Sequence, residues 1–381
     1  MTEAAPRRIV YLSGTRADFG LMVSTLQRMR ATPGLAVQVA VTGMHLSAQH
    51  GHTVDEVAAS GLEICARIPY DVATRTGASM AEGIAACLHG VTLLLQQQRP
   101  DALLVLGDRG EMLAGAIAAL HVGVPCVHVH GGERSGTVDE PVRHAISKLS
   151  SCHFVATEGA RERLQRMGED PARIFVTGAP GLDGLQALGA ADRQACLAAL
   201  RLPVGSRFLL ALFHPVVQQA QDAGVQAGAL LRALAAAGLP VLWLEPNADA
   251  GSLEILRALD ATPLPPGSRR LRHLPRAEYV AALRHCEALV GNSSSGVIEA
   301  ASFGTPVVNV GDRQRMREHG PNVVDVVCDE AAIRVALRQQ LRQGRYGCDN
   351  AWGDGQAGER IAQLLATLPL DARLLDKINT Y

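Results

Sequence analysis

Short apolar runs alternate along this chain with longer stretches in which apolar residues recur every three or four positions. The runs are rich in valine and leucine, as at 101–106 and 208–213. Such runs are typical of strands buried in a parallel sheet, and the stretches between them are typical of amphipathic helices. The pattern therefore predicts an α/β protein in which strands and helices alternate.

The predicted strands are spread over both halves of the chain. They cover 8–12, 37–41, 101–106, 125–130, 153–157, 174–177, 208–213, 241–244, 271–274, 288–290, 306–310 and 323–327. Helical periodicity covers 21–30, 53–60, 80–97, 111–121, 276–286 and 356–368.

A chain of 381 residues suits two domains. We place the first at 1–185 and the second at 186–365, with a C-terminal segment at 366–381. Polar motifs follow most predicted strands, and ligands bind at the carboxyl edge of open α/β sheets. Two open α/β domains facing each other across a cleft are therefore the predicted architecture.

A serine-rich turn follows the predicted strand at 288–290. Ser293, Ser294 and Ser295 come at the expected start of a helix, where free backbone N–H groups and the helix dipole attract anions. Glu299 lies about one turn later and suits a sugar hydroxyl, as an acidic residue does in dinucleotide folds. The alternative is that the serines only cap the helix and Glu299 only favours its first turn.

Other charged residues also follow strands. Arg16 comes after the turn at Gly14 and suits a phosphate, although a solvated loop arginine is the alternative. Asp108 and Arg109 end the strand at 101–106, where Asp108 can also be a simple helix cap. His45 follows the strand at 37–41, but a lone loop histidine is more often not a proton carrier.

The loop at 131–140 is glycine-rich and acidic. It contains Glu133 and Asp139, and Arg143 and His144 follow at the start of a helix. Carboxylates gathered in a cleft are candidates for acid–base chemistry, because burial and repulsion move their pKa values apart. The alternative is an exposed acidic loop.

His128 and His130 alternate along one strand and so face the same side. This spacing occurs in metal sites, but a third ligand is missing nearby, and we expect no metal.

Composition narrows the class of protein. The 36 basic and 37 acidic residues nearly cancel, which argues against nucleic acid or an anionic membrane as a partner. Charges or polar residues interrupt every apolar run, so no membrane span is expected. The first eight residues are not typical of a signal peptide, and the eight cysteines include no CxxC pair, so we expect a cytoplasmic protein with reduced thiols.

Taken together, these motifs resemble the hydrolysing sugar-nucleotide 2-epimerases, such as the UDP-N-acetylglucosamine 2-epimerases of sialic acid synthesis. The resemblance covers nearly the whole chain, and each motif is weak alone, but their shared order is specific. It rests on residues 13–20, 42–45, 106–109, 130–133, 139–146, 213–215, 246–252, 291–296 and 311–314.

The resemblance implies two Rossmann-like domains, as in GT-B glycosyltransferases, with the C-terminal helix crossing back to the first domain. It also implies a reaction without metal or cofactor. A base removes the proton at C2 while the nucleoside diphosphate leaves C1, water adds to the resulting glycal, and the free 2-epimeric sugar is released. Relatives are dimers or tetramers, so a homodimer or homotetramer is expected.

The resemblance also implies residue roles. Asp108, Glu133 and Asp139 would form the acid–base set together with His214, and either Asp139 or Glu133 would be the C2 base. Glu299 would accept the ribose hydroxyls, and His45, His130, Arg143 and His144 would support the site. The nucleotide would be held by Arg16, Ala17, Arg109, His214, Asn247, Leu274, Ser293, Ser294, Ser295 and Arg313.

The substrate stays open at this stage. The main interpretation is conversion of UDP-GlcNAc to UDP and N-acetylmannosamine, and the Gly131-Gly132-Glu133 loop favours the hydrolysing branch over the non-hydrolysing one. The alternative is a UDP- or GDP-linked 2,4-diacetamido-2,4,6-trideoxy sugar of legionaminic acid synthesis. A GT-B glycosyltransferase is the alternative class, and a binding-only regulator is disfavoured because all three carboxylates are present.

Overall fold

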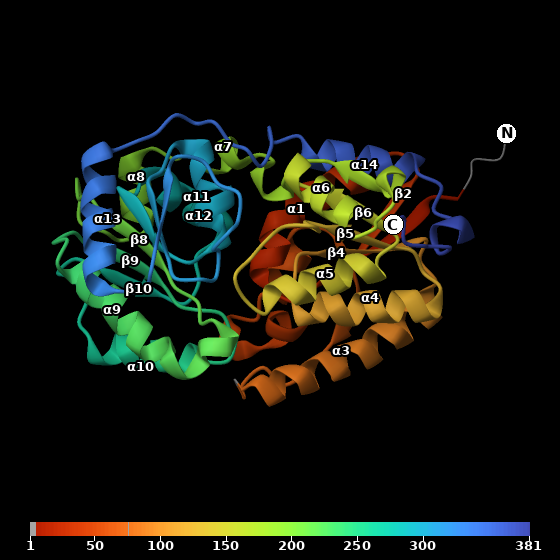
Figure 1. Cartoon of the computed structure of the whole chain (residues 1–381), viewed down its shortest axis with the longest axis horizontal. Coiled ribbons are helices and arrows are strands. Elements are labelled where there is room, and N and C mark those ends of the chain that lie inside the picture. Colours follow the sequence, from red (N-terminus) through yellow and green to blue (C-terminus); the bar gives the residue numbers. More distant parts are fainter. Residues whose placement is uncertain (1–4, 75) are drawn as a thin grey trace.

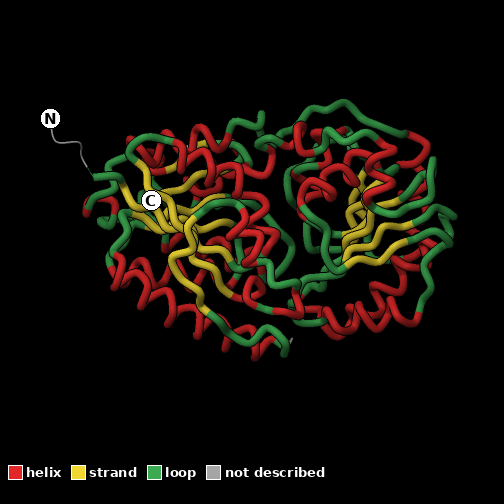
Figure 2. The backbone as a smooth tube through the Cα atoms, turned by 180° about the vertical axis from the view of Figure 1, so that it is seen from behind, coloured by secondary structure: helices red, strands yellow, loops and turns green. Residues whose placement is uncertain are grey.

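The computed structural model describes residues 5–74 and 76–381 and arranges them as two α/β domains lying side by side (Figure 1). Each domain is built on one parallel sheet with helices packed around it, as the tube in Figure 2 shows. The predicted fold class, two Rossmann-like domains, is confirmed.

The first domain contains a seven-stranded sheet within the described residues, in the order β3-β2-β1-β4-β5-β6-β7. Alternate residues of β1 enter different cores, with Ile9 and Tyr11 on one face and Val10 and Leu12 on the other. Burial on both faces explains why its sequence is continuously apolar. The strands are β1 Arg7–Ser13, β2 Leu35–Thr42, β3 Glu63–Ile68, β4 Ala102–Leu106, β5 Cys126–Val129, β6 Cys152–Val155 and β7 Ile174–Val176.

Strand β3 is absent from the sequence-based prediction. Among the described residues it pairs with β2 alone, at the edge of the sheet, and Ile68 is the one buried residue of its six. An edge strand of this kind mixes apolar and charged residues, so it lacks the continuous apolar run that identifies the central strands.

The helices of the first domain are α1 Arg16–Ala31, α2 Val54–Ala59, α3 Gly77–Gln98, α4 Gly110–Val122, α5 Asp139–Leu149 and α6 Glu158–Arg166. Helix α1 begins five residues before the predicted start at 21. A capping box explains the difference, because the Thr15 hydroxyl accepts the Asp18 N–H and the Asp18 carboxylate accepts the Thr15 N–H. Arg16 thereby becomes the first helical residue.

The second domain has a six-stranded sheet in the order β10-β9-β8-β11-β12-β13 among the described residues. Its strands are β8 Leu209–Leu212, β9 Val241–Leu244, β10 Arg269–Leu271, β11 Ala288–Gly291, β12 Val307–Val310 and β13 Val323–Val326. Strand β10 ends at Leu271, whereas the prediction placed a strand at 271–274. The later helices are α7 Leu185–Leu188, α8 Arg193–Ala199, α9 Ala223–Ala235, α10 Ser252–Ala261, α11 Arg276–His285, α12 Ser294–Ile298, α13 Glu330–Gln343 and α14 Ala357–Thr367.

The chain returns to the first domain earlier than the segment boundary at 366 suggests. Helix α14 packs along α1, and its Ile361, Ala362 and Leu365 lie in the same core as β1 (Figure 1). Helix α14 thus crosses back to the first domain, as the resemblance implies, although the periodicity of its apolar face does not by itself say which domain that face covers.

Helix α3 differs from the expectation that no segment is long and apolar enough to cross a membrane. By length and composition alone it passes that test, because among its 22 residues Glu82 is the only Asp, Glu, Lys or Arg. Cys87, Val91 and Leu95 of this helix pack into the core beside α4. Core helices of folded domains meet the same criterion, so the finding is weak evidence for a membrane.

Both sheets have a point where the strand order reverses. In the first sheet β1 and β4 are neighbours, and in the second sheet β8 and β11 are neighbours, with all of these pairs parallel. Connections leave such a pair in opposite directions and open a crevice at the carboxyl ends of its strands. Glycine at 291 allows β8 and β11 to approach closely, because a Cβ there would overlap the Leu212 carbonyl of β8. Its φ of +144° also favours glycine.

Candidate active site

A cavity of about 390 Å³ lies between the domains, at the reversal points of both sheets. The turns after β1, β4 and β5 and the start of α5 form one wall, and the turns after β8, β9, β11 and β12 form the other. Most predicted site residues therefore meet here: Arg16, Ala17, Asp108, Arg109, His130, Asp139, Arg143, His214, Asn247, Ser293, Ser294 and Arg313.

A larger hollow of about 850 Å³ lies elsewhere and is lined mainly by the loops around Glu158, Gly178 and 348–355. None of the predicted site residues borders it. The chemistry-bearing groups are gathered in the smaller cavity.

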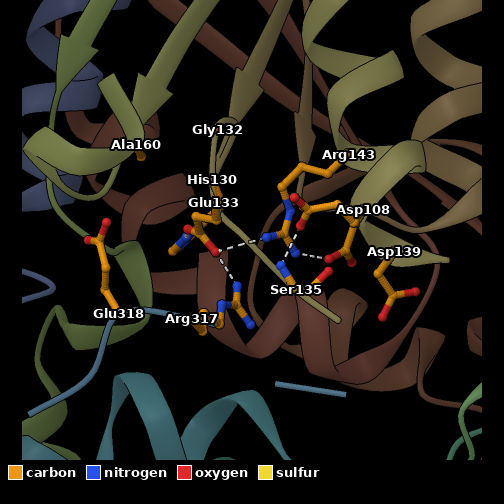
Figure 3. A network of polar contacts seen from close by, with 12 residues as sticks. Asp108, His130, Gly132, Glu133, Ser135, Asp139, Arg143, Ala160, Arg317 and Glu318 are labelled. Atoms are coloured by element: carbon orange, nitrogen blue, oxygen red, sulfur yellow. Dashed lines mark hydrogen bonds and ion pairs between the residues drawn. The ribbon is translucent and has the colours of Figure 1, made fainter. Parts of the chain in front are cut away.

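Arg143 joins two of the predicted carboxylates. It is almost completely buried, forms a short ion pair with Asp108, and places its Nη1 3.4 Å from Glu133. Figure 3 shows its guanidinium between these two carboxylates, with Asp139 beyond Asp108. Burial and the nearby Arg317 guanidinium lower the pKa of Arg143, whereas the two adjacent carboxylates favour its charged form.

Glu133 does not line the cavity but lies directly behind it. Its side chain is 2% exposed and is paired with Arg317 and His130. Burial would raise the pKa of Glu133, but Arg317 and His130 outweigh that effect and lower it to about 2. Glu133 is therefore held as a carboxylate whose negative charge is already compensated.

Arg317 is the main functional residue that the sequence analysis missed. It comes from the loop after β12 in the second domain, pairs with Glu133 of the first, and lies over the Trp352 ring with its Cζ 5.4 Å from the centroid. The sequence feature that could have identified Arg317 is its position four residues after Arg313, within the polar segment that follows the predicted strand at 306–310.

Asp139 has a different environment from Glu133. It is the first residue of α5, lines the cavity, and has a side chain that is 27% exposed. Its nearest ionic partner is Arg313, whose Nη2 lies 3.9 Å from Oδ2. Asp139 is thus the carboxylate with access to the cavity and only a loose partner.

Arginines line both walls of the cavity. Arg109 places its Nε 3.2 Å from Glu111 and its Nη1 3.5 Å from Asp249 of the second domain. Arg313 donates from Nη1 to the Asn292 carbonyl at 3.2 Å. Together with Arg16 these guanidinium groups suit the negative charge of a diphosphate.

His214 follows β8 and is held by the residue that follows β11. Its backbone N–H donates to Asn292 Oδ1 at 2.7 Å, and the Asn292 amide donates to the His214 carbonyl at 2.8 Å. Burial, with Arg313 and Arg109 nearby, lowers the pKa of His214 to about 3. Because the Asn247 N–H donates to Nδ1 at 3.2 Å, the neutral ring carries its proton on Nε2 and can donate it.

The helix that begins at the serine turn is short. Helix α12 has five residues, with Ser293 as its N-cap, and a 3₁₀ turn at Ala300–Phe303 follows. So short a helix has little dipole, and the turn therefore offers mainly hydroxyls and backbone N–H groups to an anion. Glu299 lies at the C-cap of α12 instead of inside a longer helix.

Several predicted residues do not border the cavity. Leu274 is buried in the core of the second domain, and Ser295 bonds Tyr279 and Ser293. The Glu299 carboxylate, 2% exposed, is 2.9 Å from Arg276. The remaining two are histidines of the first domain: His45 lies between Ser13 and Thr53, and His144 pairs with Glu140 at 3.1 Å.

The two strand histidines do not form a pair of metal ligands. His128 is buried between the Gly107 carbonyl and Ser147, whereas His130, at φ +63°, turns toward Glu133 and the cavity. Among the described residues no group of three or more His, Cys, Asp or Glu side chains is placed to hold a metal.

Further residues that the sequence analysis did not single out also line the cavity, among them Ser135, Gln314 and His273. Ser135 lies in the acidic loop, and its N–H donates to Glu140. The neighbouring Gly136 packs so closely on the Asp312 carbonyl of the second domain that a Cβ would overlap it. The acidic loop is therefore pressed against the second domain.

Comparison with known proteins gives consistent matches. The family model described as UDP-N-acetylglucosamine 2-epimerase matches residues 27–366. A UDP-N,N'-diacetylbacillosamine 2-epimerase (hydrolyzing) of Legionella pneumophila is 45% identical over 98% of this chain and 100% of that protein. A UDP-N-acetylglucosamine 2-epimerase of Neisseria meningitidis is 32% identical over 94% of this chain and 95% of that protein.

The fold also matches solved structures. The UDP-GlcNAc 2-epimerase of Methanocaldococcus jannaschii, in complex with UDP-GlcNAc and UDP, aligns with a TM-score of 0.80 at 19% identity, over 94% of this chain and 99% of that one. The family match over most of the chain, together with the assembled carboxylates and arginines, shows that this protein belongs to the UDP-N-acetylglucosamine 2-epimerase family.

Proposed function

We propose that this protein is a hydrolysing 2-epimerase whose substrate is UDP-N,N'-diacetylbacillosamine, a UDP-linked 2,4-diacetamido-2,4,6-trideoxy sugar. The observation that carries the choice of substrate is the 45% identity, over 98% of the chain, with a relative named for that activity. The relative named for UDP-GlcNAc is 32% identical. The interpretation given second place in the sequence analysis thus has better support than the first.

The proposed reaction has two steps. In the first, a base takes the proton from C2, the C1–O bond to UDP breaks, and a C1=C2 double bond forms. In the second, water adds its oxygen to C1 and a proton returns to C2 on the opposite face. The product is the free 2-epimeric sugar, and UDP carries away the electron pair of the broken C1–O bond.

The environments of the carboxylates support distinct roles. Asp139 faces the cavity with a loose partner, so it is the proposed C2 base. Glu133 is behind the cavity, and its low pKa, about 2, makes it a poor base, so it holds Arg143 and Arg317 in place. Asp108, which borders the cavity beside Arg143, is the proposed second acid–base group.

The leaving group requires positive charge and hydrogen-bond donors near the diphosphate. Arg16, Arg109 and Arg313 line the cavity and supply the charge, while neutral His214 supplies an Nε2 proton. Ser293 and Ser294 also line the cavity. These leaving-group residues come from both domains. The proposed mechanism therefore requires the two domains to be closed on the substrate.

The test is proton NMR of the purified protein in D₂O with UDP-N,N'-diacetylbacillosamine, its GDP analogue and UDP-GlcNAc. Release of UDP with a 2-epimeric diacetamido-trideoxy sugar deuterated at C2 is the expected result. Turnover of UDP-GlcNAc to deuterated N-acetylmannosamine, at higher kcat/KM, would keep the mechanism and replace the substrate. Product without deuterium at C2 would exclude the elimination route.

A further inference from the structure

Helix α5 carries two site residues at one end and is fastened at the other end by the C-terminus of the chain. Asp139 and Arg143 lie in its first two turns. At its last turn, Lys377 donates from Nζ to the carbonyls of Ser147 at 2.9 Å, Lys148 at 2.9 Å and Ser150 at 2.8 Å. Carbonyls at a helix C-terminus have no partner within the helix, and a cation there also suits the helix dipole.

The Lys377 ammonium is itself held in a built site. Its Nζ lies 2.6 Å from Glu169, whose side chain is fully buried and also pairs with His153 at 2.8 Å and Lys148 at 2.7 Å. The Thr380 N–H then donates to the Gly168 carbonyl at 3.0 Å. Figure 1 shows the C-terminus beside the first domain, close to α5 and β6.

A chain of hydrogen bonds continues from this anchor to the active site. Ser147 lies one turn after Arg143, and its Oγ is 3.0 Å from His128 Nδ1. His128 donates from Nε2 to the Gly107 carbonyl at 2.7 Å, directly before Asp108. Burial lowers the pKa of His128 to about 3, so the ring is neutral and Ser147 is the donor to Nδ1.

We propose that Lys377 is a positioning residue for the active site: it fixes the C-terminal end of α5 so that Asp139 and Arg143 stay in register with Asp108. This inference rests on the proposed function, in which these side chains act on the sugar. Lys377 does not contact Asp108, Asp139 or Arg143 directly. Lys377 acts through the helix and through the Ser147–His128 contact.

A small change in the tilt of α5 moves its N-terminal residues by a large distance. About ten residues separate Asp139 from the anchored end, which corresponds to about 15 Å of helix. Once the anchor is lost, a tilt of α5 by about 5° moves Asp139 by about 1.3 Å relative to the C-terminal end of the helix, and a misplacement of about 1 Å can reduce a rate about 100-fold. Loss of the anchor therefore affects turnover more than nucleotide binding, because most of the arginines and serines facing the diphosphate lie on other elements.

The experiment compares Lys377→Met with a matched control elsewhere. Arg7 donates from Nη1 to the carbonyls of Leu365 at 2.8 Å and Leu368 at 2.5 Å, so it binds the C-terminal carbonyls of α14, a helix without site residues. We expect K377M to lower kcat about 100-fold with KM and UDP affinity within about threefold. R7M should lower the melting temperature similarly and leave kcat within about twofold, and K377R should recover part of the lost kcat.

Hydrogen–deuterium exchange gives a second readout that does not depend on substrate. K377M should speed exchange of the amides of 139–149, including the first turn, whereas R7M should speed exchange only around 357–368. Unchanged exchange in α5, or equal loss of kcat in K377M and R7M, would overturn the inference. If K377M does not fold, Lys377→Gln, which keeps a donor, takes its place with the same expectations. Failure of the wild-type protein to turn over any of the three nucleotide sugars would instead refute the proposed function, and the exchange data would still test the anchor.

Discussion

Arg317 of the second domain forms a buried ion pair with Glu133 of the first domain, although 184 residues separate them in the sequence. Their side chains are 7% and 2% exposed. Glu133 in turn contacts Arg143, which pairs with Asp108. The charge balance around the proposed catalytic carboxylates is therefore complete only when the two domains are together.

Arg317→Met should strongly impair both stability and activity. It leaves the Glu133 carboxylate buried with less compensation, and breaking a buried ion pair from one side costs about 3–5 kcal/mol. The pKa of Glu133 should rise from its lowered value, which moves the acid limb of the pH–rate profile to higher pH. Urea unfolding and the pH dependence of kcat measure the two effects. Arg315→Met is the matched control, because Arg315 is in the same loop and its side chain is 68% exposed; equal effects in both variants would show that the Glu133 contact is unimportant.

Asp139→Asn and Glu133→Gln should separate the two candidate bases. We expect Asp139→Asn to abolish turnover while UDP affinity and melting temperature stay close to those of the wild type, since Asp139 has only a loose ionic partner. Glu133→Gln should reduce stability by about 3 kcal/mol or more, because the buried Arg317 guanidinium loses its carboxylate partner and Arg143 keeps Asp108 but loses Glu133. Turnover in D₂O, calorimetric UDP binding and thermal unfolding measure these properties. Normal turnover by Asp139→Asn would remove Asp139 from the mechanism.

Stability should fall as the pH decreases below about 6.5. Burial lowers the pKa of His128 and His214 to about 3 and that of His45 to about 4. Below the unfolded value of about 6.5 the unfolded chain binds protons that the folded protein does not, so each histidine costs about 1.4 kcal/mol per pH unit down to its folded pKa. His45→Gln should reduce the slope of unfolding free energy against pH by about one proton between pH 6 and 4.5. An unchanged slope would mean that His45 is protonated in the folded state.

Glu299 tests how the ribose is bound. If it accepts the ribose hydroxyls, as the sequence analysis predicts, Glu299→Gln should weaken UDP binding about tenfold, because charged acceptors contribute about 1.5–3 kcal/mol. Arg276→Met removes the present partner of Glu299 without removing the acceptor, so it is the control. Isothermal titration with UDP gives the affinities. A lower melting temperature in both variants with unchanged UDP affinity would restrict Glu299 to an internal ion pair.

Local sequence signals located the parts of the site that lie at strand ends. Asp108, His214 and Ser293 each follow a buried apolar strand, and parallel sheets place such positions at one edge. The predicted start of α1 at 21 is wrong, and the capping box at Thr15 and Asp18 is the local signal that marks the actual start at Arg16. The family resemblance then supplied roles that patterning alone could not assign.

Contacts between distant segments had no comparable signal. Arg317 was overlooked because nothing near it in the sequence identifies Glu133 as its partner, and the edge strand β3 lacked an apolar run. His128 and His130 looked equivalent by alternation, yet the left-handed backbone at His130 ends the alternation and sends one ring into the domain and the other toward the cavity.

The sequence by itself determined the order of strands and helices, the two parallel-sheet domains and the polar motifs at strand ends, because hydrophobic periodicity and turn chemistry are local properties. Only the tertiary structure decided which carboxylate is compensated and which faces the cavity, and that Lys377 binds the C-terminal end of α5. Charge compensation and burial depend on side chains brought together from remote parts of the chain, and the pKa and orientation of each group follow from those neighbours.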